Sequence, residues 1–248
     1  MTKHMLTSAL FAGFAVGLLV ALLQFAFVEQ KILLAEEYES GALVHFQGAI
    51  AGADHDHGDA PAADAAATEA TGHDHGAMAG EETSPLVRHG LSVLFAAVIY
   101  VGYALVMVAG FAIATRHGVT VTPLQGLLWG LAGFMAVQMA PAMGLEPELP
   151  GTPAADLTAR QLWWGGCAIA TICGLGLIGY GRGVVAKLAG VLLLALPHVV
   201  GAPELEHFGG VVPPELASSF AARSLGVGLI AWVALGGLLA WFWNREPA

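Results

Sequence analysis

Six long apolar stretches constrain the fold of this chain more than any other feature of its sequence. They cover about residues 6–28, 89–115, 122–143, 160–181, 184–201 and 217–243. Each is long enough, or nearly so, to cross the roughly 30 Å hydrocarbon core of a bilayer, and backbone in lipid must pair within its own segment. Only 11% of the 248 residues are charged, against about 25% in soluble domains. The sequence therefore predicts an all-α, polytopic membrane protein with a bundle of six transmembrane helices.

The predicted helices divide the chain into three regions. Residues 1–28 contain the first helix, 29–87 form an extracytoplasmic loop, and 88–248 contain the other five helices. The first apolar run has about 23 residues. A cleaved signal peptide has a core of roughly 7–15, so we expect this run to be retained. Within the loop, 48–83 is rich in Ala, Gly, Asp and His without periodicity, which predicts disorder.

Charged residues predict the orientation of the bundle. With the N-terminus in the cytoplasm, the inner side carries five basic residues: Lys3, Arg116, Arg182, Lys187 and Arg245. The outer side carries four: Lys31, Arg88, Arg160 and Arg223. This small difference follows the positive-inside rule, so we expect both termini to be cytoplasmic. All 19 acids except Glu246 then lie outside, where an acidic surface would concentrate cations.

Small residues four apart predict where helices meet, because they let two backbones approach closely. Three of the predicted helices carry such a spacing. The residues are Ala9, Gly13 and Gly17 on the first, Gly126 and Gly130 on the third, and Ala222 and Gly226 on the sixth.

Two copies of His-Asp-His-Gly lie in the long polar loop. They contain His55, Asp56 and His57, and then His73, Asp74 and His75. In an extended chain, residues two apart point the same way, so each histidine pair can face one ion. Imidazole suits Zn, Cu, Fe and Ni, and Co by the same chemistry. The repeats therefore predict divalent-metal contact; the alternative is a low-complexity tract without such a role.

A second candidate site surrounds His198, near the outer end of the fifth apolar stretch. Pro197 removes a helix hydrogen bond, and irregular backbone at membrane depth is tolerated where it lines a cavity. Together with Glu204, Glu206 and His207 in the following loop, His198 could form the mouth of a metal path. The alternative is an interfacial histidine that bonds to a neighbouring helix. Ligand histidines must be neutral, so capture should fade below about pH 6.

Other polar or soft side chains in the apolar stretches leave two interpretations open. Met135, Met139 and Met143 share one helix face, which either packs or contacts soft ions. Gln24 and Gln138 either bond across helices or line a path. No acid or base lies near the middle of a predicted helix, so a residue that couples transport to an ion gradient is not evident. We find neither a phosphate-binding loop nor a hydrolase nucleophile motif, which predicts that the protein is not an enzyme.

Several fragments carry a resemblance to a known family. They are Glu-Pro-Glu-Leu-Pro-Gly at 146–151, Asp-Leu at 156–157, Arg-Gln-Leu-Trp-Trp at 160–164, Leu-Pro-His-Val-Val-Gly-Ala-Pro at 196–203 and the apolar span from Phe220 to Gly236. With them, the chain resembles the cobalt transporter subunit family CbtA over most of its length. The resemblance implies a subunit that transports Co²⁺, or the related Ni²⁺ or Zn²⁺, for cobalamin synthesis across the bacterial cytoplasmic membrane. It also implies a small, single-span, histidine-bearing partner (CbtB-like), and it carries over His198 but not the loop repeats.

Two other functions remain open from the sequence. The chain could be a membrane metal sensor or a metallochaperone scaffold that transports nothing. It could also be a membrane oxidoreductase, although His89, His117 and His198 all lie near the ends of predicted helices. In every case we expect contact with membrane lipid, no permanently bound cofactor and no nucleic-acid partner, with oligomerisation left open.

Overall fold

A computed structural model describes residues 2–45, 84–205 and 209–245, which contain helices and no strand. The prediction of an all-α fold is therefore confirmed for the described part. The helices are α1 (Thr2–Phe27), α2 (Glu29–Glu39), α4 (Pro85–Arg116), α5 (Pro123–Phe134), the π-helix η1 (Met135–Met139), α6 (Ala140–Ala142), α7 (Leu157–Tyr180), α8 (Gly183–Val200) and α9 (Pro214–Trp243).

Five of the six predicted membrane helices are present as single helices long and apolar enough to cross a bilayer. They are α1, α4, α7, α8 and α9. The remaining stretch, 122–143, is helical from Pro123 to Ala142 but is divided into α5, η1 and α6. The prediction of six membrane spans is thus confirmed for five, and the crossing by 123–142 stays a prediction, as does the division into three regions.

Pro141 accounts for the irregular segment in that sixth stretch. Proline has no N–H to donate, and its ring displaces the carbonyl four residues earlier. In η1 the N–H of Ala140 donates to the carbonyl oxygen of Met135, five residues back. This wider turn is the signature of a π-helix, which occurs mostly as a short interruption and often at functional sites.

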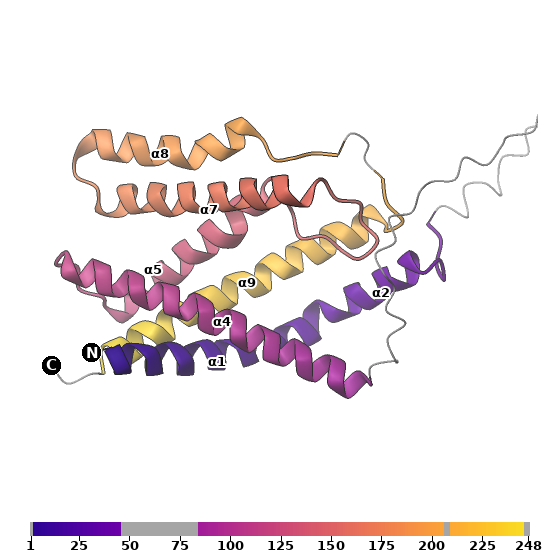
Figure 1. Cartoon of the computed structure of the whole chain (residues 1–248), viewed down its shortest axis with the longest axis horizontal. Coiled ribbons are helices and arrows are strands. Elements are labelled where there is room, and N and C mark those ends of the chain that lie inside the picture. The colour runs from indigo at the N-terminus through magenta and orange to yellow at the C-terminus, as the bar shows by residue number, and fades with distance from the viewer. Residues whose placement is uncertain (1, 46–83, 206–208, 246–248) are drawn as a thin grey trace, which may run out of the picture.

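The long helices run between two ends of the molecule (Figure 1). The two chain termini, the loop between α4 and α5, and the turn between α7 and α8 lie at one end. The end of α9 contacts the loop between α4 and α5, because the side-chain amide of Asn244 donates to the Val121 carbonyl at 2.8 Å. α7 and α8 form an antiparallel hairpin beside the bundle of α1, α4, α5 and α9.

Glycines make two of the closest helix contacts, as the spacing of small residues predicts. A Cβ on Gly13 would lie 2.5 Å from Cα of Val101, and one on Gly17 would collide with the Ala97 backbone, so α1 packs directly on α4. α5 meets α9 in the same way, where a Cβ on Gly126 would lie 2.5 Å from the Gly236 carbonyl oxygen.

The predicted contact at Gly226 on α9 is wrong. No atom lies within 4 Å of the position that a Cβ there would take, and Ala222 is exposed. α9 instead approaches α5 through Gly236, which lies ten residues further along α9 and on a different face of the helix. Spacing alone cannot choose between faces when a helix is rich in small residues.

Gly17→Ala should destabilise the protein by about 1–3 kcal/mol, because a methyl group forced into a packed contact moves the two helices apart. The midpoint of thermal unfolding in detergent would measure the loss. Gly102→Ala on α4 is the matched control, since its added methyl group meets open space. Equal midpoints for the two variants would contradict the tight α1–α4 contact.

The two ends of the molecule differ in charge. Every acid that the structure describes lies in α2, α9's first turn or the loops at the end opposite the termini: Glu29, Glu36, Glu37, Glu39, Glu146, Glu148, Asp156, Glu204 and Glu215. At this acidic end a Cβ on Gly151 would lie 2.9 Å from Val211 Cγ2 and 3.2 Å from Glu39 Cβ. Three segments distant in sequence therefore meet there. The end that carries the termini has Arg116, Arg182 and Arg245.

Candidate functional site

The predicted metal residues fall into two groups. Eight lie outside the residues that the structure describes: His55, Asp56, His57, His73, Asp74, His75, Glu206 and His207. Their metal contacts stay predictions. His198 and Glu204 are described, and within the described ranges no group of three or more His, Cys, Asp or Glu side chains could hold a metal ion. Neither residue completes a metal site with other described side chains.

His198 lies near the acidic end of α8 and is half-buried. Its ring meets that of Trp163 edge to face, with 6.2 Å between the ring centroids. The sequence suggests a break at Pro197, but α8 continues through Pro197 to Val200. It ends at Gly201, whose φ of 86° suits glycine. The histidine therefore sits on the last regular turn of a helix.

The carbonyl oxygen of Pro197 joins α8 to α7. It accepts a hydrogen bond from Trp163 Nε1 at 3.2 Å. The same indole packs beside Gly144, where a Cβ would lie 2.9 Å from Trp163 Cη2 and 2.7 Å from Ala202 Cβ. Trp163 thus connects the loop after α6, the helix α7 and the segment after α8. The packing fixes the surroundings of His198.

An ion pair links segment 147–151 to segment 160–164. Arg160 Nη2 donates to Glu148 Oε2 at 2.6 Å. Asp156 accepts a hydrogen bond from the Ala159 N–H at 2.8 Å and so caps the N-terminus of α7. Two carboxylates of this loop therefore have structural partners. Glu146 and Glu204 are exposed at the same end.

The segments 147–151, 160–164 and 196–203 thus converge at one corner of the acidic end, although they are far apart in sequence. The sequence model of the CbtA family, described as a probable cobalt transporter subunit, matches residues 2–244. The chain belongs to the CbtA family. Comparison with curated proteins and with solved structures gave no significant match. The family and the five membrane-length helices together indicate that this CbtA chain is a membrane protein.

A cavity of about 310 Å³ lies beside η1 in this CbtA chain. Its polar lining comes from three helices distant in sequence: Gln24 of α1, Gln138 of η1 and Ser224 of α9. Gln138 Oε1 is buried and has no hydrogen-bond partner among the described residues. That oxygen has almost no accessible surface and lies against Gly228 of α9, so it faces the helix contact and not the open space of the cavity. Sequence reasoning missed Ser224.

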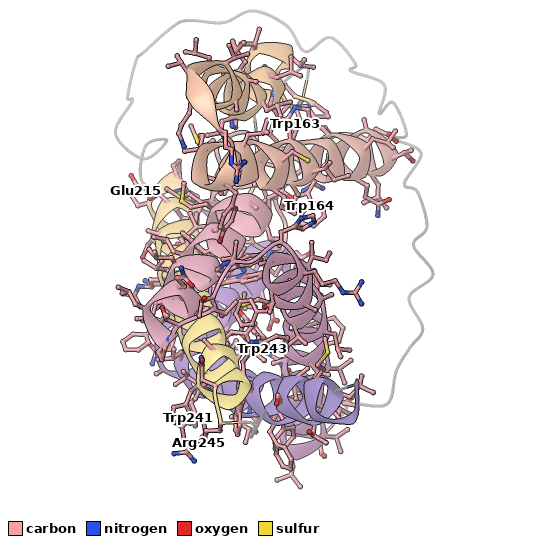
Figure 2. The ribbon with its side chains drawn as sticks, turned by 90° about the vertical axis from the view of Figure 1, so that its left-hand side faces the viewer. Trp163, Trp164, Glu215, Trp241, Trp243 and Arg245 are labelled. Carbon is pink, nitrogen blue, oxygen red and sulfur yellow. The ribbon has the colours of Figure 1, made fainter. Side chains whose placement is uncertain are left out.

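Two tryptophans that are adjacent in sequence face different surroundings. Figure 2 shows Trp163 pointing from α7 toward α8, and Trp164 pointing to the opposite side of α7. Trp164 lines the cavity beside η1. Each ring of this adjacent pair therefore has its own specific contact. One ring joins the hairpin, and the other forms part of the cavity wall.

The methionine face has no part in this cavity. Met135, Met139 and Met143 are 37%, 37% and 70% exposed, and none of them lines the cavity. They face outward from the helical stretch 123–142. A path for soft ions along these thioethers therefore has no support in the structure.

Proposed function

We propose that this chain is the membrane subunit that captures Co²⁺ on the extracytoplasmic face of the bacterial cytoplasmic membrane and passes it across that membrane. The observation that carries this function is the match of the CbtA family to residues 2–244. The proposal assigns the acidic end to the outer face and both termini to the cytoplasm. Co²⁺, with Ni²⁺ or Zn²⁺ as related ions, is the transported substrate and not a resident cofactor.

Capture begins at the acidic end in this proposal. The described acids gather there, and a surface of one charge raises the local concentration of counter-ions. Histidines of the two loop repeats bind the ion weakly and release it to His198 with Glu204, Glu206 and His207. The corner held by Trp163 and the Glu148–Arg160 pair supports this step, since it fixes the backbone around His198.

A second subunit is part of the proposal. The family description names a transporter subunit, which implies a partner. We assign that role to a small, single-span, histidine-bearing protein, and we assign the transported cobalt to cobalamin synthesis. No catalytic role is proposed for any residue.

Uptake of labelled cobalt tests the function directly. Cells that express the chain with its partner should accumulate cobalt faster than cells that lack the chain. Uptake should also fall between about pH 7 and pH 5, because protonated histidines no longer bind metal and repel the cation. Equal uptake with and without the chain would favour the alternative of a metal sensor or metallochaperone scaffold.

A further inference from the structure

We propose that the cavity beside η1 binds one phospholipid whose headgroup carries a phosphate and a primary ammonium group, as in phosphatidylethanolamine. The first part of an acyl chain fills the cavity. Arg223 holds the phosphate and Glu146 holds the ammonium group. The site does not depend on the proposed transport function, because it rests on the cavity and on the two charges beside it.

The cavity has the size and the lining of a small-molecule site. Its volume is about 310 Å³, at the lower end of the roughly 300–1,000 Å³ that is typical of ligand pockets. Most of its lining is apolar, with Val137, Pro141 and Leu145 from the segment around η1 and Val227 from α9. A hydrocarbon chain can bury its surface against such a lining.

The cavity opens sideways toward the bilayer. Among the described residues that line it, only Gln24 of α1 and Trp164 of α7 are exposed. The opening therefore lies between these two helices. Both are long and apolar enough to cross a bilayer, so acyl chains surround them at this level. A molecule that enters the cavity through this opening comes from the lipid.

The depth of the cavity matches the join between a phospholipid headgroup and its acyl chains. Counted from the end of the molecule that carries the termini, the roughly 20 residues that cross a hydrocarbon core lead from Met5 to Gln24 on α1 and from Trp243 to Ser224 on α9. Both polar side chains line the cavity. They therefore lie at the level of the lipid ester groups, and Val227 lies about one turn deeper.

Arg223 places a positive charge beside the cavity at headgroup level. It precedes Ser224, which lines the cavity. Its Nη1 donates at 3.0 Å to the carbonyl oxygen of Phe27, and the next residue, Val28, also lines the cavity. Arg223 is exposed and, unlike Arg160, has no carboxylate partner among the described residues. A guanidinium presents five N–H donors in a fork that matches a phosphate, so four remain for that group.

Glu146 supplies the opposite charge from another element. It lies between Leu145 and Pro147, which both line the cavity. Its carboxylate is exposed and forms no ion pair with a described residue. An ammonium group can therefore meet Glu146 while the phosphate meets Arg223. The same carboxylate repels a headgroup of net negative charge, such as that of phosphatidylglycerol.

Quenching of Trp164 fluorescence tests the site, because bromine atoms on an acyl chain quench a tryptophan that they contact. The full-length chain in detergent micelles should show saturable quenching by phosphatidylethanolamine that is brominated near the headgroup end of its chains. The saturable part should vanish in Trp164→Phe. Brominated phosphatidylglycerol should need about fivefold more lipid for half-saturation, as expected for the loss of one exposed ion pair.

Charge-removing variants test the two ends of the headgroup. Arg223→Gln should raise the half-saturating concentration of phosphatidylethanolamine at least about tenfold, although glutamine keeps a donor for the Phe27 carbonyl. Glu146→Gln should abolish the preference for phosphatidylethanolamine. Arg182→Gln is the matched control, because Arg182 is exposed at the opposite end of the molecule, and it should change neither value. Protein yield and elution from a sizing column would show that each variant folds.

The remaining outcomes count against the site. Quenching that rises without saturation would mean that only bulk lipid contacts Trp164, and would overturn the proposal. Equal half-saturation by the two lipids in the intact chain would overturn it as well, and so would unchanged binding in Arg223→Gln. Cobalt uptake plays no part in these measurements, so a failure of the transport function would leave the lipid site standing.

Discussion

His198→Ala is expected to lower the initial rate of cobalt uptake by at least about tenfold, since even outer partners of metal ligands are worth about 10–100-fold in metal affinity. The imidazole lies at the acidic end of α8, and the Trp163 contact fixes its surroundings. His117→Ala is the matched control, because His117 caps α4 at the opposite end of the molecule. Equal uptake by the two variants would exclude His198 from the path.

His198→Phe separates metal binding from packing. Phenylalanine keeps a ring beside Trp163 but has no nitrogen to bind an ion. We expect uptake as low as in His198→Ala. If His198→Phe restores uptake, the role of the residue is to pack against Trp163, and the metal ligands lie elsewhere.

Replacing the four loop histidines, His55, His57, His73 and His75, by alanine should raise the cobalt concentration for half-maximal uptake about tenfold. The maximal rate should stay near that of the intact chain, because a capture site raises local concentration without forming the path. The variant should also depend less on pH between about 5 and 7, since fewer histidines titrate there. Uptake at limiting and at saturating cobalt, measured at both pH values, checks each expectation. Normal uptake at limiting cobalt would show that the loop does not capture metal.

The predicted helix positions agree with the structure because lipid leaves the backbone few alternatives. The apolar stretch 217–243 corresponds to α9, and 160–181 corresponds to α7. The π-helix was not predicted, because hydropathy reports which residues are apolar and says nothing about which carbonyl each N–H reaches. Pro141 indicates a disturbed helix at this point, but a proline near a helix end is equally compatible with the ordinary end of that helix.

The cavity could be predicted only in part. Gln24 and Gln138 are conspicuous as polar side chains in apolar stretches, but their sequence positions do not show that they meet. Ser224 is inconspicuous, because a serine hydroxyl in a helix can bond to its own backbone. Only the packing of α9 against η1, with Gly228 at the contact, shows that these three side chains share one space.

The α7–α8 hairpin is attached to the rest of the molecule mainly through one stretch of chain. Among the described elements, the hairpin's main contacts with the rest of the molecule are those of α7 with α5, η1 and α6, which are parts of one stretch, 123–142. α8 exposes Val184, Val185 and Val199 by 73–81%, and lipid can cover these side chains in any orientation of the hairpin. Hydrogen bonds nevertheless hold both ends of α7, from Trp129 Nε1 to Tyr180 Oη at 3.0 Å and from Arg160 to Glu148 at 2.6 Å. Because Trp164 lies on α7 and lines the cavity, any displacement of the hairpin would change the width of that cavity.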